Sequence, residues 1–499
     1  MTEATYETYE AVALERVPTG TPGLDTVLGG GLFRGAIYLV MGRPGTGKTT
    51  LGNQICFSHA AGGGRAVYVT LLAESHASMI KNLRSMEFFK PEVINHGLVY
   101  IGAYKALRDE KLKGLLSTLR RVIRDEKASI LVLDGISPTR TLAESDLALK
   151  EFIVELQILG SMMNCTTVLL ANMTADDANG PEHTMVDGLI ELAFERSRRR
   201  TYRTVEVIKF RGSQHLLGRH ELDIGGTGIV VHPRTEEVLD AHVANATRRR
   251  VSTGISQLDA MLGGGLLSGT TTVVLGFAGS GKTTVSLQFL DAGHAAGENS
   301  LHFGFYEPPA HLLDISDSLG LHLRAYAKDG SFAQIWQPTY EFGIDALLER
   351  LLADVRKRNV KRVVIDGFDG VRLAAADPER TIRVVSAITN ELRAMDVTTV
   401  ITDETLSPYG PEIATRVEAA SALFENLLLL EYMTVGTELR RLISILKQRS
   451  SEHAMSVREF KLTKHGLELA GDAASAAEIL FGFNAFGGKH PRKPRSSTP

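Results

Sequence analysis

The sequence lacks most of the features that mark disulfide-rich, membrane-embedded or secreted proteins. It contains only two cysteines among 499 residues, Cys56 and Cys165, and both have apolar neighbours. Neither a disulfide framework nor a thiolate metal site is therefore expected. No apolar run approaches the roughly 20 residues that a membrane-spanning helix needs, and no basic patch precedes an apolar stretch at the beginning, as a signal peptide would require. We expect a cytoplasmic protein that does not enter a membrane.

The sequence also lacks a strong excess of charge of either sign. It has 55 lysines and arginines against 58 aspartates and glutamates, which gives a formal net charge of −3. Proteins that bind nucleic acid over a large surface usually carry a clear positive excess, so nucleic acid is not expected as the main partner. The hydrophobic share of 43% is typical of a globular protein, and the length allows about three domains of ~150 residues.

What the sequence does contain is an internal duplication. The stretch TGTPGLDTVLGGGLFRG at residues 19–35 recurs as TGISQLDAMLGGGLLSG at 253–269, an offset of 253 − 19 = 234. Two apolar runs end in Asp134 and Asp366 (366 − 134 = 232), and VIKFRGSQH and ILKQRSSEH place their lysines 238 residues apart. Landmarks in one order at nearly constant spacing predict two copies of one domain.

Each copy alternates short apolar runs with helical patterns, which predicts an α/β fold. In the first copy the runs AIYLVMG, AVYVTLL, LVYIGAY, SILVLDG and TTVLLAN have the length of buried parallel strands. We expect a mostly parallel twisted sheet with helices on both faces, and an antiparallel ribbon at its edge around an arginine-rich turn. The expected divisions are a flexible N-terminus at 1–15, domains at 16–243 and 244–475 with a connector near 236–250, and a basic Pro/Gly-containing flexible tail at 476–499.

Each copy also carries a phosphate-binding loop after a strand and before a helix. GRPGTGKT and GFAGSGKT both fit the pattern G-x-x-x-x-G-K-[ST], in which backbone N–H groups and a lysine hold nucleotide phosphates. A glycine-rich turn without a ligand is the alternative for one short motif, but two complete copies argue against it. The candidate nucleotide-binding residues are Gly42, Gly45, Thr46, Gly47, Lys48, Thr49, Thr50, Gly276, Gly279, Ser280, Gly281, Lys282, Thr283 and Thr284.

ATP and Mg²⁺ are the expected ligands of both loops. The hydroxyl groups of Thr49 and Thr283 are candidate metal ligands, and the strand-end carboxylates of Asp134 and Asp366 are expected to hold the same ion directly or through water. Chemistry on the terminal phosphate also needs a group that orients or deprotonates the attacking oxygen.

Two glutamates are the candidates for this catalytic role. Glu307 follows a strand in LHFGFYEPP, and Glu74 holds the comparable place in VYVTLLAES, with 307 − 74 = 233. A solvated acid in the first turn of the next helix is the alternative for both residues. Glu307 is the stronger candidate, because the segment between strand and acid is one residue longer around Glu74.

These motifs together resemble the KaiC family of clock ATPases and its bacterial relatives. The resemblance rests on LDTVLGGGLFRG, the paired phosphate loops and KFRG-x-x-H after an arginine-rich turn, and it covers about residues 16–470. It implies tandem RecA-like P-loop NTPase domains in a homo-oligomer, a ring of six chains, with ATP between neighbouring subunits. It also implies that cations reach the neighbour's phosphates, with two further residues near the base and ribose. The matching residues are Lys209, Arg211, Ser213, His215, Lys447 and Arg449.

The resemblance further implies a division of labour between the two rings. In the family the first ring hydrolyses ATP slowly, and the second phosphorylates and dephosphorylates itself on an adjacent Ser-Thr pair. Here the matching residues are Ser421 and Ala422, which leaves Ser421 as the candidate phosphosite of a serine/threonine autokinase; a small residue packed at an interface is the alternative for Ser421. A KaiB-like partner is implied. The tail, with KHPRKPR at 489–495, does not resemble the segment that recruits the activator KaiA, so a KaiA-type activator is not expected.

Two other functions fit parts of the sequence. A DNA-transacting RecA-like ATPase, a recombinase or helicase, would use basic clusters such as those in FERSRRRTYR and NATRRRV, and salt-sensitive DNA binding would favour it. A structural ring that uses nucleotide only as glue would keep its phosphate release unchanged in Glu74→Gln and Glu307→Gln. The preferred hypothesis is a ring-forming ATPase and autokinase in circadian-type timekeeping or signal regulation.

Overall fold

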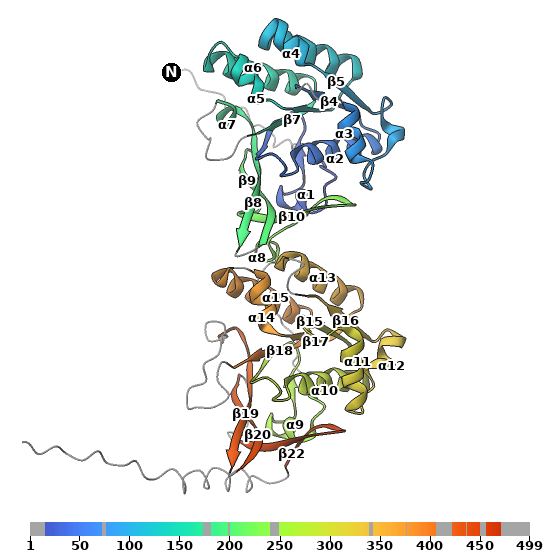
Figure 1. Ribbon diagram of the computed structural model, residues 1–499, viewed down its shortest axis with the longest axis vertical. Coiled ribbons are helices and arrows are strands. Elements are labelled where there is room, and N and C mark those ends of the chain that lie inside the picture. The colour runs from blue at the N-terminus through green and yellow to red at the C-terminus, as the bar shows by residue number, and fades with distance from the viewer. Residues whose placement is uncertain are drawn as a thin grey trace, which may run out of the picture. The chain divides into compact units, whose positions relative to one another are not determined.

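The computed structural model shows two compact units, one ending at Val238 and the other beginning at Leu239 (Figure 1). Within the described ranges, every helix is too short or too polar to cross a membrane. The described residues are 15–71, 76–172, 181–197, 200–239, 249–338, 343–375, 377–405, 422–435, 437–449 and 456–470.

The first unit is built on a nine-stranded sheet with the order β11-β10-β9-β8-β3-β7-β6-β4-β5. The six strands from β8 to β5 in this order pair in parallel, and β9, β10 and β11 continue the sheet as an antiparallel edge. β1 (Arg16–Val17) and β2 (Leu32–Phe33) form a separate two-stranded sheet. The strands of the large sheet are β3 (Ile37–Gly42), β4 (Ala66–Thr70), β5 (Leu98–Gly102), β6 (Ile130–Asp134), β7 (Thr166–Ala171), β8 (Gly188–Ser197), β9 (Arg200–Phe210), β10 (Arg219–Gly225) and β11 (Gly228–His232).

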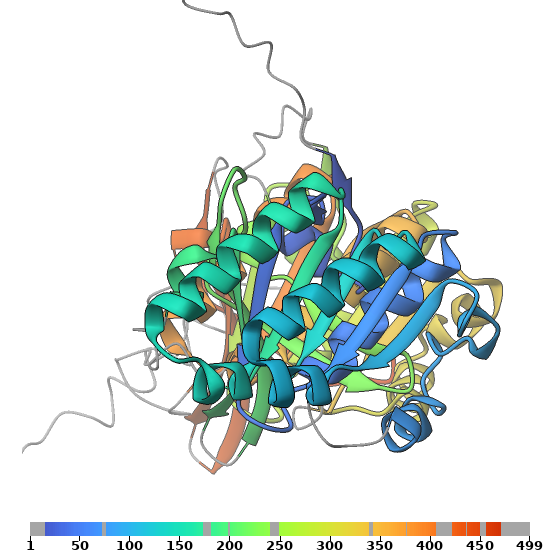
Figure 2. The same ribbon diagram turned by 90° about the horizontal axis from the view of Figure 1, so that it is seen from above.

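Helices cover both faces of this sheet because its strands are apolar on both sides. Tyr38 and Val40 of β3 face one core, while Leu39 and Met41 face the other, as the two-residue period of a strand requires. The first core is closed by α2, and the second by α4 and α6, which lie side by side in Figure 2. The helices are α1 (Leu24–Val27), α2 (Lys48–Ala61), α3 (His76–Leu83), the 3-10 helix η1 (Pro91–Val93), α4 (Tyr104–Glu126), α5 (Ser137–Leu142), α6 (Asp146–Met162), α7 (Pro181–Met185) and α8 (Thr235–Val238).

The second unit repeats this topology. Its nine-stranded sheet has the order β16-β15-β17-β18-β14-β19-β20-β21-β22, again with six parallel strands followed by three antiparallel ones. β12 (Arg250–Val251) and β13 (Leu266–Leu267) form a separate two-stranded sheet. The strands of the large sheet are β14 (Thr271–Gly276), β15 (Asn299–Gly304), β16 (Phe332–Trp336), β17 (Val360–Asp366), β18 (Thr398–Glu404), β19 (Asn426–Val435), β20 (Glu438–Gln448), β21 (Arg458–Thr463) and β22 (Gly466–Leu469).

Its helices are likewise divided between two cores. One core contains residues of α9, α10, α11 and α12, and the other residues of α13, α14 and α15. The helices are α9 (Ser256–Met261), α10 (Lys282–Ala295), α11 (Pro309–Ser318), α12 (Leu323–Asp329), α13 (Ile344–Lys357), α14 (Phe368–Ala375) and α15 (Pro378–Ala394).

The predicted fold class is confirmed: each unit is a mostly parallel sheet with helices on both faces and an antiparallel edge. β8 and β9 pair antiparallel before and after the arginine-rich segment, so the predicted ribbon is present. Two more antiparallel strands, β10 and β11, extend the edge beyond the prediction. Cys56 and Cys165 are free and buried.

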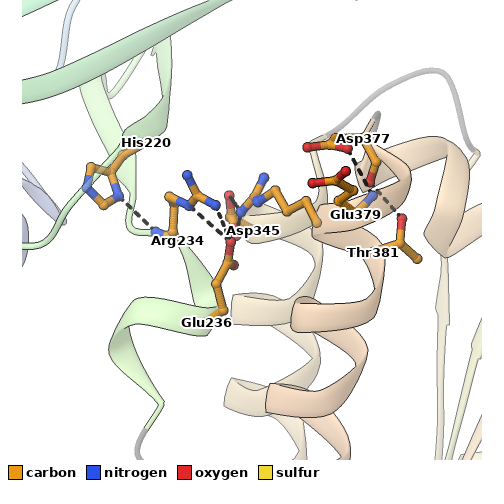
Figure 3. A network of polar contacts seen from close by, with 8 residues as sticks. His220, Arg234, Glu236, Asp345, Asp377, Glu379 and Thr381 are labelled. Atoms are coloured by element: carbon orange, nitrogen blue, oxygen red, sulfur yellow. Dashed lines mark hydrogen bonds and ion pairs between the residues drawn. The ribbon is translucent and has the colours of Figure 1, made fainter. Parts of the chain in front are cut away.

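Polar contacts fix the ends of equivalent helices in the two units. Ser145 accepts a hydrogen bond from the backbone N–H of Ala148 at the start of α6 (3.1 Å), and Asp377 accepts one from Glu379 at the start of α15 (3.0 Å). Figure 3 shows Asp377 at this cap and, in the first unit, Arg234 between His220 and Glu236. Each cap satisfies a backbone donor that the helix itself leaves free.

Candidate nucleotide site

The phosphate loop of the first unit connects β3 to α2 in the conformation that its glycines permit. Gly47 is the N-cap of α2 with φ 112°, in the left-handed region that other residues avoid. Lys48 follows it, and its Nζ donates to the carbonyls of Gly42 (2.8 Å) and Arg43 (3.0 Å). The lysine therefore folds back over the loop, where nucleotide phosphates would compete for its charge.

A hydroxyl and a carboxylate meet beside this lysine. Thr49 donates its Oγ1 hydrogen to Asp134 Oδ2 at 3.0 Å, and the buried Tyr68 donates its hydroxyl to the same oxygen at 2.6 Å. Burial and the Asp134 charge raise the pKa of Tyr68 well above its usual range, so the tyrosine remains a neutral donor. Burial lowers the pKa of Lys48, and Asp134 opposes that shift. The predicted metal pair Thr49–Asp134 is brought together.

The loop of the second unit has the same backbone form and a different set of charges. Gly281 caps α10 with φ 108°, and Lys282 Nζ donates to the carbonyls of Gly276 (2.9 Å) and Phe277 (3.1 Å). The same Nζ lies 3.8 Å from Glu404 Oε1, at the end of β18. Burial lowers the pKa of Lys282, while Glu404 and two nearby aspartates, Asp366 and Asp403, raise it.

Asp366 is held by side chains other than those around Asp134. Thr402 donates to Asp366 Oδ1 at 2.5 Å, and the fully buried His302 places Nε2 3.4 Å from Oδ2. Burial raises the pKa of Asp366, but His302, Thr402 and Lys282 outweigh it and keep the pKa below its ordinary value. Within the described residues no hydrogen bond joins Thr283 to Asp366, whereas Thr49 and Asp134 of the first predicted metal pair are directly bonded.

Oxygen donors of this kind suit Mg²⁺ in both units. The described residues contain no cluster of three or more histidine, cysteine or acidic side chains able to hold a metal by themselves. Mg²⁺ in nucleotide sites usually needs only one or two carboxylates, with waters and phosphates completing the shell. A hydroxyl beside an aspartate fits that requirement.

Of the two predicted catalytic glutamates, the structure describes one. Glu307 lies between β15 and α11, and its Oε2 is paired with His311 Nδ1 one helical turn later. Its backbone carbonyl accepts from Gln334 Nε2 at 3.3 Å. Sequence reasoning missed His311, although its spacing of four residues from Glu307, which lies just before the helix, was an available signal. Glu74 lies outside the described residues.

The predicted cations of the first unit lie at the opposite end of the sheet from their own phosphate loop. Gly42 is in register with Leu192 of β8, which pairs with Val205 of β9. Lys209 is four residues further along β9 (209 − 205 = 4), or about 13 Å at ~3.3 Å per residue. There Lys209 Nζ and Arg211 Nη2 donate to the carbonyl of Thr184 at 2.9 Å and 3.2 Å.

The second unit has the same arrangement. Gly276 is in register with Leu430, which pairs with Ile443, and Lys447 again lies four residues further (447 − 443 = 4). Burial and neighbouring arginines lower the pKa of both lysines: Arg211 acts on Lys209, and Arg449 acts on Lys447. In each unit the lysine and the arginine therefore place two positive charges close together, towards the amino ends of the parallel strands and away from the phosphate loop of the same unit.

Ser213 and His215 lie next to this cation pair in the sequence. Ser213 Oγ accepts from Arg16 Nη2 at 2.5 Å and donates to the carbonyl of Gln214 at 2.9 Å. His215 is half-buried. Their predicted role near base and ribose stays a prediction, as does that of the candidate phosphosite Ser421, which is outside the described residues.

Sequence reasoning missed an arginine beside the first phosphate loop and its counterpart in the second unit. Arg203 lies over the ring of Phe194 (5.2 Å to the centroid) and its Nε points to the carbonyl of Gly45 at 3.4 Å. Arg441 lies over Tyr432 at 5.4 Å in the second unit. The signal was present, since 441 − 203 = 238 is also the spacing of Lys209 and Lys447.

Paired phosphate loops on two such sheets define a tandem P-loop ATPase with RecA-like domains. The family model of the KaiC ATPase matches residues 17–236 and again residues 251–474. The chain belongs to the KaiC family, and the resemblance read from the sequence is confirmed.

Relatives with clock names extend along nearly the whole chain. The circadian clock oscillator protein KaiC of Thermostichus vulcanus is 26% identical over 485 residues, 94% of this chain and 92% of the relative. The circadian clock protein KaiC2 of Synechocystis sp. is 27% identical over 488 residues, 95% and 84% of the two chains. KaiC3 of the same organism is 24% identical over 487 residues, 95% of each.

Proposed function

We propose that this KaiC-family ATPase assembles into a ring of six chains, hydrolyses ATP with Mg²⁺, and phosphorylates itself on serine or threonine as part of a timekeeping or signalling system. The observation that carries the proposal is the separation of each phosphate loop from the cation pair of its own unit. The loop opens at the carboxyl ends of the parallel strands, and the lysine–arginine pair lies towards their amino ends.

That separation supports assembly because the cations cannot serve their own loop. Charge that develops on a transferring phosphoryl group is stabilised by positive groups placed opposite the phosphate loop. Lys209 with Arg211, and Lys447 with Arg449, supply such groups to a neighbour. A nucleotide between two copies of the chain would then be held from both sides.

The chemistry assigns one role to each remaining group. Thr49 with Asp134, and Thr283 with Asp366, would hold Mg²⁺, which would supply positive charge to offset that of the phosphates. Lys48 and Lys282 orient the terminal phosphate. Glu307 accepts the proton of the attacking oxygen while the bond between the terminal phosphorus and the bridging oxygen breaks and ADP leaves. In the first unit we assign the same role to Glu74.

The attacking oxygen distinguishes the two units. We assign water to the first unit, which gives phosphate release, and the hydroxyl of Ser421 to the second, which gives a phosphoserine. The clock names of the relatives support a role in timekeeping, and a KaiB-like protein is the proposed partner.

One measurement tests assembly and modification together: native mass spectrometry with ATP and Mg²⁺, followed by intact-mass analysis of the same sample. Six chains and about one added phosphate per chain are expected. Material that stays monomeric with saturating nucleotide and still hydrolyses it at full rate would exclude the shared site.

Labelled ATP tests the modification site separately. Ser421→Ala should remove most incorporated label, and Thr415→Ala serves as the matched control in the same segment. Label that persists in Ser421→Ala would move the site to Thr415, Ser450 or Ser451, and no label in either protein would leave an ATPase without kinase activity.

A further inference from the structure

The two phosphate loops differ in the residue at the end of the neighbouring parallel strand. β18 pairs with β14, and its last residue, Glu404, is in register with Gly276, where the loop begins. In the first unit β7 ends at Ala171, and Asn172 occupies the equivalent position, since 404 − 172 = 232 is also the spacing of Asp134 and Asp366. One unit therefore has a carboxylate where the other has an amide.

This carboxylate reaches the loop lysine. Glu404 Oε1 lies 3.8 Å from Lys282 Nζ, and the glutamate side chain is 60% exposed while that of the lysine is 11% exposed. In the first unit Lys48 Nζ bonds to two backbone carbonyls. Among the described residues, which exclude Glu74, no carboxylate lies within 4.0 Å of it.

An ion pair this open to water contributes little to the stability of the fold. Its position beside the phosphate loop instead suggests an effect on nucleotide binding. The lysine of a phosphate loop binds the β- and γ-phosphates. A diphosphate leaves the space of the terminal phosphate free, and Glu404 can stay beside Lys282. A triphosphate brings further negative charge into that space, so Lys282 must leave Glu404 and the carboxylate then faces the terminal phosphate.

We propose that Glu404 sets the nucleotide preference of the second site, favouring nucleoside diphosphate over triphosphate relative to the first site. The inference deepens the proposed function and rests on both loops binding nucleotide. Like charges a few ångströms apart at a partly exposed site repel by an amount worth about five- to tenfold in affinity. The second site would consequently release its product more slowly, relative to substrate capture, than the first.

The test compares affinities for ADP and for the β,γ-imido analogue of ATP, with Mg²⁺, by calorimetry in proteins with one working loop. In the Lys48→Ala background, Glu404→Gln should lower the dissociation constant of the triphosphate analogue about five- to tenfold and change that of ADP less than twofold. Glu468→Gln, which removes an exposed charge on β22, is the matched control and should change neither affinity.

The reciprocal variant keeps the inference testable if Glu404→Gln folds poorly. In the Lys282→Ala background, Asn172→Glu should weaken binding of the analogue more than binding of ADP. Equal changes for both nucleotides, or no change, in both variants would overturn the assignment to Glu404 while leaving nucleotide binding intact. Absence of binding in both backgrounds would instead overturn the proposed function, and the inference with it.

Discussion

The two units share one topology but surround their strand-end aspartates with different side chains. Asp134 accepts from the neutral Tyr68 of β4, whereas Asp366 lies beside His302 of β15, the residue at the equivalent position (302 − 68 = 234). Thr402 donates a hydrogen bond to Asp366 in the second unit, whereas the equivalent residue of the first unit, Leu170 (402 − 170 = 232), has no polar side chain. Duplication preserved the backbone that positions the aspartate, while the polar groups around it diverged.

The interiors of the two units differ as well. Arg362 of β17 is fully buried; it donates to Glu298 Oε2 at 2.6 Å and to the carbonyls of Ser252 and Phe289 at 2.7 Å and 2.8 Å. The equivalent positions in the first unit are Ile130 (362 − 232) and Gly64 (298 − 234). A buried charged pair in the second unit thus stands where the first unit has an isoleucine and a glycine, so the second unit depends on charge at positions where the first has none.

The largest expected effect comes from breaking this buried pair. Glu298→Gln leaves the Arg362 guanidinium without a counter-charge and should lower the unfolding free energy of the second unit by about 3–5 kcal/mol. Chemical denaturation, followed by the single tryptophan, Trp336, reports this unit. Arg362→Ile combined with Glu298→Ala, close to the first unit's residues, should cost less than Glu298→Gln alone. A larger cost for the double variant would contradict the account.

The phosphate-loop lysines come next. Lys48→Ala and Lys282→Ala should each weaken nucleotide binding at the altered site about 100-fold, as expected for the loss of charge-assisted hydrogen bonds to phosphate. The first should mainly reduce phosphate release or assembly, and the second should mainly reduce incorporation of label from ATP. Identical effects of the two substitutions on both readouts would refute the division of labour.

Acid should increase the difference in stability between the two units. Burial raises the pKa of Glu298, but its hydrogen bonds to Arg362 and Arg249 outweigh this and hold the pKa below its ordinary value. A carboxyl with a lowered folded-state pKa contributes stability that is complete above its unfolded pKa of about 4.3 and is lost as the pH falls through the folded value. Denaturation between pH 6 and pH 3 should show the tryptophan-reported unit losing stability, and Glu298→Gln should flatten that dependence.

A smaller effect is expected at the aspartate of the first unit. Tyr68→Phe removes one donor from Asp134 and should cost about 1–2 kcal/mol of unfolding free energy, because a buried acceptor loses a partner. Tyr100→Phe, which removes a hydroxyl bonded to Asn53 at 2.8 Å, is a control on the neighbouring strand. Only Tyr68→Phe should also raise the Mg²⁺ concentration needed for half-maximal phosphate release, and an equal rise in both variants would contradict the role of Asp134.

The smallest contrast concerns the helix caps. Ser145→Ala and Asp377→Ala should each cost about 1 kcal/mol. The aspartate should cost slightly more because its charge also interacts with the helix dipole. Thermal denaturation at low and high salt would show whether this extra cost is screened, and a cost of Ser145→Ala that exceeded that of Asp377→Ala would contradict the comparison.

The sequence was sufficient to predict the repeated strands and the short local motifs of the two units. Strand-length apolar runs predicted the parallel sheets, and the G-x-x-x-x-G-K-[ST] pattern predicted loops whose Gly47 and Gly281 adopt a left-handed backbone. The spacing of 238 residues that revealed Lys209 and Lys447 also pointed to Arg203 and Arg441, but only the sheet register showed where these residues lie.

Contacts between strands that are distant in the chain could not be predicted in this way. The pairing of Lys282 with Glu404 depends on β14 lying next to β18, and that of Arg362 with Glu298 on the packing of β17 against a segment 64 residues earlier (362 − 298). The sequence shows a tyrosine at position 68 and a histidine at position 302. Their contacts with Asp134 and Asp366 depend on the order of the strands in the sheet, which composition and periodicity do not predict.

The remoteness of each cation pair from its own loop has a geometric consequence for assembly. Contact between a loop on one copy and a cation edge on the next joins two unlike surfaces, and such contacts either close into a ring or continue without end. Each unit of the chain carries one phosphate loop and one cation pair. A ring of such chains would close only if both units preferred the same rotation between neighbouring chains. In the proposed assembly, substitutions that alter this rotation in one unit would therefore strain the other, and the subunit number would depend on both units at once.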